Sequence, residues 1–160
     1  MKKIILFAFI LFVENLVGQK ITTKMIDQTV LTIEADPTLV RKEIDSAEDN
    51  KKLEIWYKGN EIFKIKSEKE LLSGKHSVTI YLKGNNPIKV IEEEENMDTI
   101  ADRQNKQKTK KVFKTIVYEF NGKKKLRGVV VKGKRILSKA SFPPHDYENL
   151  INDAKSSLKI

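Results

Sequence analysis

The sequence predicts an α+β fold: an antiparallel β-meander of about six to seven strands packed against a C-terminal amphipathic helix, with a short helix near residues 37–48. Two observations lead to this fold class. Stretches of alternating apolar and polar residues recur along the chain with Gly and Asn between them, and the last residues carry one apolar stripe at helical spacing. A chain of 160 residues suffices for one domain with a sizeable core.

The first eighteen residues have the pattern of a signal peptide. Lys2 and Lys3 precede an unbroken apolar run over residues 4–13, and Gly18 is the best cleavage position. A bilayer span needs about 20 apolar residues, so this run is too short to remain as a transmembrane helix. We therefore expect a signal peptide over residues 1–18 and a single domain over residues 19–160. The alternative is an ordinary buried N-terminal strand or helix.

The first two elements of the mature chain are assigned from composition and from a capping signal. Residues 29–34 are rich in β-branched side chains and predict a strand. Asp36 and Pro37 follow as a candidate N-cap and first helical residue, which predicts the short helix near residues 37–48.

Three hairpins are predicted further along the chain. Gly59-Asn60 separates two alternating runs, and a second turn over residues 84–87 separates two more. Residues 56–60 align with residues 81–85, and residues 118–122 form a looser third version. This similarity indicates either an internal repeat or the general composition of hairpin turns, and we favour the latter because turns select Gly and Asn for backbone reasons. Trp56 and Phe63 are expected to oppose each other across the first turn, as packing.

Residues 92–95 are four consecutive glutamates, which predict a solvated acidic run. The polar residues 96–110 are expected to form a linker or a weak surface helix that could be mobile. Residues 111–131 then form the clearest hairpin, and residues 135–140 predict a further strand.

The C-terminal helix is predicted from spacing alone. Its apolar residues recur at intervals of three and four, and acids at its start and lysines at its end suit the helix dipole. The stripe comprises Tyr147, Leu150, Ile151, Ala154 and Leu158. Such a narrow stripe fits one partner surface, and we expect that surface to be the sheet.

The charge of the chain is unevenly distributed. The whole chain has 31 basic and 22 acidic residues, a formal charge of +9, whereas residues 103–139 hold fourteen basic residues against the single acid Glu119. Such asymmetry bears on partners, because a basic region attracts anionic ligands.

If Asn121 and Gly122 alone form the third turn, Tyr118 opposes Lys125, Ile116 opposes Arg127 and Val117 opposes Leu126. One face of this hairpin, with Phe113 and Val117, should then point into the core. The other face would interleave exposed aromatic rings with cations, as a polyanion-binding surface requires. The candidate polyanion-binding residues are Lys114, Tyr118, Phe120, Lys123, Lys125, Arg127, Lys132, Lys134 and Arg135. The competing interpretation is an ordinary solvated face, since Lys and Arg stems often cover apolar neighbours.

No residue is assigned a catalytic, cofactor-binding or metal-binding role. The sequence has no cysteine and only two histidines, and it lacks the Gly-rich motifs that hold phosphates. His145-Asp146 is the only adjacent His–carboxylate pair and is better explained as the start of the last helix.

The sequence therefore favours an exported, periplasmic or extracellular protein without enzymatic activity that binds a macromolecule or small ligand on its sheet. The first alternative is binding of a polyanion (lipopolysaccharide, an anionic glycan or extracellular DNA) to hairpin 111–131. The second is a small secreted hydrolase, which would bring His76 or His145 to a carboxylate and a hydroxyl. The partner is expected to be an anionic polymer or an envelope protein.

Overall fold

A computed structural model describes residues 21–46, 50–97, 109–119, 126–133 and 147–160. Helix α2 (Thr23–Ala35) comes first among them and helix α3 (Tyr147–Leu158) last. The strands between the helices are β1 (Val40–Ser46), β2 (Lys51–Lys58), β3 (Glu61–Leu71), β4 (Gly74–Lys83), β5 (Asn86–Met97), β6 (Thr109–Glu119) and β7 (Leu126–Gly133).

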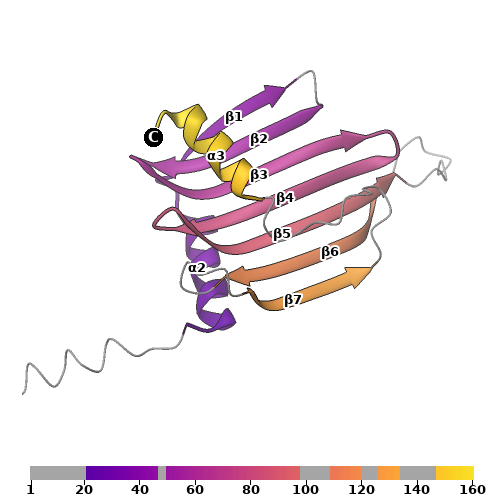
Figure 1. The fold of residues 1–160 in the computed structure, drawn as a ribbon, viewed down its shortest axis with the longest axis horizontal. Coiled ribbons are helices and arrows are strands. Elements are labelled where there is room, and N and C mark those ends of the chain that lie inside the picture. Colours follow the sequence, from indigo (N-terminus) through magenta and orange to yellow (C-terminus); the bar gives the residue numbers. More distant parts are fainter. Residues whose placement is uncertain (1–20, 47–49, 98–108, 120–125, 134–146) are drawn as a thin grey trace, which may run out of the picture.

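The described strands form one antiparallel sheet in which each strand pairs with the next one in the chain, in the order β1 to β7 (Figure 1). The predicted α+β meander with a C-terminal helix is therefore confirmed. Both helices pack on the sheet, α3 on one face and α2 on the other, so the strands carry apolar residues on both faces.

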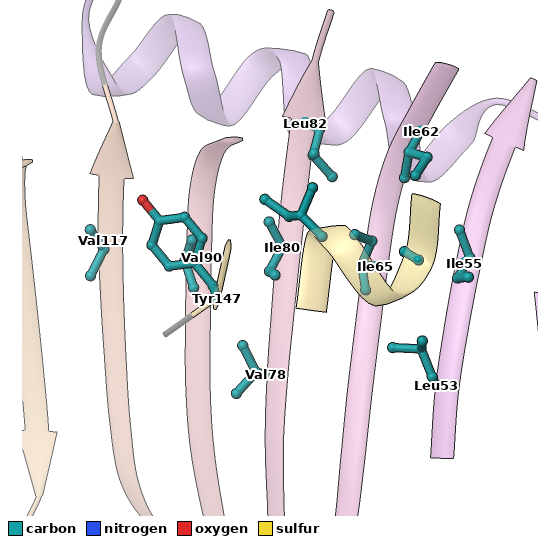
Figure 2. Close-up of a cluster of buried hydrophobic side chains, with 12 residues drawn as sticks. Leu53, Ile55, Ile62, Ile65, Val78, Ile80, Leu82, Val90, Val117 and Tyr147 are labelled. Atoms are coloured by element: carbon teal, nitrogen blue, oxygen red, sulfur yellow. The ribbon is translucent and has the colours of Figure 1, made fainter. Parts of the chain in front are cut away.

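The larger core lies between the sheet and α3. Ile55, Ile65 and Ile80 are register neighbours on three adjacent strands, and each is fully buried. Figure 2 shows these side chains on the same face as α3, together with Val90 and Val117 from β5 and β6. The expectation that Val117 points into the core is confirmed.

The predicted apolar stripe of the last helix is also confirmed. Tyr147, Ile151 and Ala154 are buried against this core, and Leu150 and Leu158 pack at its margin. Lys42 on β1 donates a hydrogen bond to the backbone oxygen of Ser157 at 2.7 Å, which ties the end of α3 to the first strand.

Residues 29–34 form part of α2, so the predicted strand is wrong. Ile26, Val30 and Ile33 follow each other at intervals of four and three and lie buried on one side of the helix. Thr22 caps the helix by accepting a hydrogen bond from the backbone N–H of Met25. The β-branched composition favoured a strand, but a stripe with helical spacing that can be buried outweighs intrinsic propensity.

The short helix near residues 37–48 is also wrong, because residues 40–46 form β1. Asp36 is the C-cap residue of α2, and its side chain accepts hydrogen bonds from the backbone N–H and the hydroxyl of Thr38. An Asp-Pro pair suits such a turn as well as a helix start, so the local signal was ambiguous. Pairing of β1 with β2 decides in favour of the strand.

The first two predicted hairpins are confirmed in position. Lys58 pairs with Glu61 across Gly59-Asn60, and Lys83 pairs with Asn86 across Gly84-Asn85. Gly59, Gly84 and Asn85 all have φ near +60°, a region that Gly and Asn enter at low cost.

The polar segment 96–110 is shorter than predicted, because β5 extends to Met97 and β6 begins at Thr109. The predicted signal peptide, the further strand over residues 135–140 and His145-Asp146 lie outside the described residues.

The α3 core predicts a clear contrast between a buried and an exposed apolar residue. Ile80→Ala should lower the free energy of unfolding by about 2–5 kcal/mol, because it leaves a cavity in the centre of the sheet. Leu31 lies on the outer side of α2 and is 61% exposed, so Leu31→Ala should change the free energy of unfolding by less than about 0.5 kcal/mol. Urea denaturation followed by circular dichroism measures both values. Equal losses would contradict the assignment of the core.

Candidate functional site

A row of alternating cationic and aromatic residues crosses the sheet on the α2 face. Its members occupy successive register positions, one on each strand from β1 to β7. We call this row the cation–aromatic ladder; it comprises Arg41, Trp56, Lys64, Tyr81, Lys89, Tyr118 and Arg127.

The two lysines of the ladder lie close to aromatic rings. The Lys64 ammonium is 4.4 Å from the centroid of the Trp56 ring and 5.7 Å from that of Tyr81. The Lys89 ammonium is 5.1 Å from the centroid of Tyr118. These distances fall within the range in which a cation is attracted by the negative face of a ring.

Two carboxylates of α2 bind to the ladder. Glu34 Oε1 accepts hydrogen bonds from Lys64 Nζ at 2.7 Å and from the Tyr81 hydroxyl at 2.6 Å. Asp27 Oδ1 accepts one from Lys89 Nζ at 2.6 Å and one from the Tyr118 hydroxyl at 3.1 Å. Each carboxylate therefore meets one ammonium and one phenol from a pair of neighbouring strands.

The spacing of the two carboxylates matches the spacing of the strands. Glu34 lies seven positions after Asp27, an offset of close to two helical turns and about 10.5 Å along the axis. The two Lys–Tyr pairs lie on β3–β4 and β5–β6, two strand spacings apart, or about 9.6 Å. A helix that crosses the strands can therefore satisfy both pairs at once (Figure 1).

Titration behaviour reflects these contacts. Burial by itself would raise the pKa of Glu34, but the hydrogen bonds from Lys64 and Tyr81 outweigh it and hold the pKa below the ordinary glutamate value. Burial, and then the hydrogen bond to Glu34, raises the pKa of the Tyr81 phenol well above its usual range. Burial and the hydrogen bond to Asp27 likewise raise the pKa of Tyr118. The raised pKa values extend to higher pH the range in which both tyrosines donate hydrogen bonds.

A shared backbone irregularity helps to align the ladder. The register shifts between Trp56 and Tyr57 in the first hairpin and between Tyr81 and Leu82 in the second, which are positions 25 residues apart. A β-bulge of this kind turns one extra side chain toward a face. Phe63 and Ile88 are the extra residues, and both pack against the α2 cluster.

The two hairpins therefore share their turn position, their bulge position and an aromatic residue eight positions before a lysine. The register of Trp56 with Lys64 replaces the predicted pairing with Phe63, because the bulge advances the register by one residue. This spacing of eight positions between an aromatic residue and a lysine is the feature of the sequence from which the ladder could have been predicted.

Tyr118 is the predicted polyanion-binding residue whose environment differs most from expectation. Its ring was expected on an exposed face, but the residue is 9% exposed, in the cluster beneath α2. The cause is α2, whose buried side chains cover this face of the sheet.

The other predicted residues are placed as follows. Lys114 is partly exposed on β6, with Nζ 3.0 Å from Glu93 Oε1. Arg127 and Lys132 lie on β7, where they are the register partners of Tyr118 and Lys114. Phe120, Lys123, Lys125, Lys134 and Arg135 lie outside the described residues.

The predicted register of the third hairpin is wrong. Tyr118 pairs with Arg127 and not with Lys125, and Val117 pairs with Val129 and not with Leu126. β6 ends at Glu119 and β7 begins at Leu126, so more than two residues connect them. A register shift between Val117 and Tyr118 moves the remaining pairs by one further position.

The acidic run is not a solvated run. Residues 92–95 belong to β5, and Glu92 and Glu94 are 2% and 0% exposed on the α3 face. Glu93 and Glu95 occupy register positions opposite Lys114 and Lys111. Successive side chains of a strand point to opposite faces of the sheet. Glu92 and Glu94 are therefore buried on one face, and Glu93 and Glu95 alternate with them and occupy positions beside lysines of β6.

Among the described residues, His76 Nε2 contacts a carboxylate, Glu92 Oε1, at 2.8 Å. A hydrolytic site would also require a hydroxyl at hydrogen-bond distance from this histidine. Within the described ranges, His76 has no such bond to a Ser or Thr hydroxyl. Of the three groups that a hydrolase would require, the described residues therefore bring together only the histidine and the carboxylate.

Other features offer little to a small ligand. A surface depression of about 310 Å³ at the end of the sheet is lined by Asn50 and by three lysines and three carboxylates, which balance in charge: Lys51, Lys52, Lys75, Asp45, Glu68 and Glu70. None of these lining residues is of an apolar type, whereas most ligand pockets are lined mainly by apolar side chains. In the part of the chain that the structure describes, no three His, Asp or Glu side chains gather as they would around a metal ion, and no helix is long and apolar enough to cross a membrane.

Comparison of this chain with known protein families, with curated proteins and with solved structures gave no match. The candidate site therefore rests on the geometry of the ladder and on the distribution of charge.

The lowered pKa of Glu34 predicts a pH-dependent contribution to stability. Glu34→Gln should lower the free energy of unfolding by about 0.5–1 kcal/mol at pH 7, a modest effect because the side chain is 42% exposed. The wild-type carboxyl binds protons more weakly when folded than when unfolded. Its contribution is therefore complete above the ordinary value of 4.5 and is lost as the pH falls through the lower folded pKa.

Urea denaturation of wild-type and Glu34→Gln proteins between pH 3 and pH 7 measures this difference. Glu70→Gln, on an exposed position of β3, serves as the control. A difference between Glu34→Gln and wild type that persists undiminished at the lowest pH would show that the carboxylate does not stabilise α2 through its charge.

Proposed function

We propose that this protein is exported and acts by binding, and that its ligand is an anionic polymer held at the basic β6–β7 edge of the sheet. The observation that carries the proposal is the segregation of charge. Fourteen of the 31 basic residues fall within residues 103–139, with one acid, and β6 and β7 come from this segment. These strands stand last in the described order of the sheet.

The register places like charges together at this edge. Lys114 and Lys132 are direct partners on β6 and β7, and like charges at such positions destabilise a sheet. Glu93 lies on the other side of Lys114 and compensates part of this charge. An anionic polymer bound at these strands would add further compensation, so the like-charge register of Lys114 and Lys132 favours the bound state.

The chemistry of the ligand follows from the chemistry of the edge. Ammonium and guanidinium groups bind sulfates, phosphates and carboxylates, and binding releases counterions from the polymer. Export, which the N-terminal leader predicts, would bring the protein to anionic glycans, lipopolysaccharide or extracellular DNA. Electrostatic attraction of this kind requires no pocket.

Salt dependence tests this proposal. The protein should be retained on heparin at low ionic strength, with an affinity that falls steeply as salt rises. Replacing Lys114, Arg127 and Lys132 together by Gln should weaken binding. The slope of log K against log salt should fall by about one for each cation that binds an anionic group of the polymer in the wild type.

The matched control removes three exposed lysines elsewhere, through Lys69→Gln, Lys83→Gln and Lys159→Gln. Both triple variants lose the same charge, so only a local site separates them. Thermal denaturation confirms that each is folded. The proposal fails if the wild-type protein does not bind heparin at low salt, or if the two triple variants bind equally well.

A further inference from the structure

The two carboxylate sites of the ladder are built for anions, and in this structure α2 fills both. We propose that α2 covers, within the same chain, a second part of the polyanion site, and that an anionic polymer bound to the sheet takes the places of Asp27 and Glu34. This inference rests on the proposed function and extends its site from the β6–β7 edge across the sheet.

The two sites have the chemistry of anion sites. Lys64 and Lys89 are only 14% and 11% exposed, yet each directs its ammonium at an acceptor on α2 and shares that acceptor with a tyrosine hydroxyl. A sulfate or a second carboxylate could accept the same pair of hydrogen bonds. Both tyrosine hydroxyls are protonated at neutral pH, as an unperturbed phenol is, and their raised pKa values extend the range in which they donate.

The ladder also continues on both sides of the two Lys–Tyr pairs. Arg127 on β7 is the next register partner after Tyr118, and Trp56 and Arg41 continue the row on β2 and β1. Trp56 is half-buried and lies between the Arg41 and Lys64 cations, at 5.6 and 4.4 Å. A polymer bound at the β7 edge is therefore already adjacent to the first site that α2 covers.

The attachment of α2 is separate from the larger core. Three apolar side chains, Ile26, Val30 and Ile33, are buried under the helix, and residues 36–39 link it to β1. The α3 core lies on the opposite face of the sheet and uses none of these residues. Release of α2 would therefore leave the larger core in place (Figure 2).

The geometry also specifies the ligand. The two sites are two strand spacings apart, so the ligand should present anionic groups about 10 Å apart along an extended chain. Binding of a single anion would not offset the loss of the buried apolar contacts of α2. A polymer with several anionic groups is therefore required, because groups on one chain bind more tightly together than each does alone.

Hydrogen exchange of the wild-type protein tests the displacement directly. With saturating heparin at low salt, amides of α2 (Thr23–Ala35) should exchange faster than in the free protein, whereas those of α3 should keep their protection. Unchanged or increased protection of α2 in the heparin complex would overturn the inference.

A pair of variants tests the competition. Asp27→Asn with Glu34→Gln removes the charges that α2 places on the ladder, and should raise heparin affinity by at least about fivefold over the matched control. That control, Asp153→Asn with Glu70→Gln, changes the net charge equally at residues that do not contact the ladder. Trp56, the single tryptophan, reports binding through its fluorescence. Equal affinities of the two double variants would overturn the inference.

The outcomes separate this inference from the proposed function. If the wild-type protein binds heparin through its basic edge but α2 stays protected and the double variants bind equally, only the role of α2 is wrong. If neither wild type nor any variant binds at low salt, the proposed function fails, and the role of α2 fails with it.

Discussion

The attachment of α2 combines three buried apolar side chains with two carboxylates that each meet a lysine and a tyrosine from neighbouring strands. Partly buried charges are stable only when opposite charge and hydrogen bonds compensate their loss of water. Asp27 and Glu34 supply this compensation to Lys89 and Lys64, which lie within a largely apolar interface. Two helical turns and two strand spacings are nearly equal lengths, and this coincidence allows one helix to satisfy both lysines.

The same need for compensation shapes the middle of the sheet. β5 carries four consecutive acids, β6 carries three lysines, and the two strands are register neighbours. Glu93 pairs with Lys114 on the α2 face, whereas Glu92 turns to the opposite face and contacts His76. The register thus places acidic residues of β5 beside lysines of β6, and Lys114 and Glu93 form an ion pair between the two strands.

Sequence patterns predicted the elements better than the contacts between them. The hairpin at Gly84-Asn85 was predictable, because positive φ selects Gly and Asn locally. The burial of Tyr118 was not predictable from local sequence. Its face of the sheet is covered by α2, which precedes Tyr118 by more than eighty residues in the chain. The register of β6 with β7 was missed for a related reason: a longer connection and a bulge both shift pairing, and neither leaves a clear local signal.

The sequence by itself determined the fold class, since period-two alternation, turn residues and the spacing of Tyr147, Ile151 and Ala154 are local properties of the chain. It also determined that positive charge accumulates between residues 103 and 139. Only the tertiary structure decided that residues 29–34 are helical and that Lys64, Tyr81, Lys89 and Tyr118 form one row. Those outcomes depend on which surfaces are buried against each other, and burial is a property of the assembled sheet and helices rather than of any single segment.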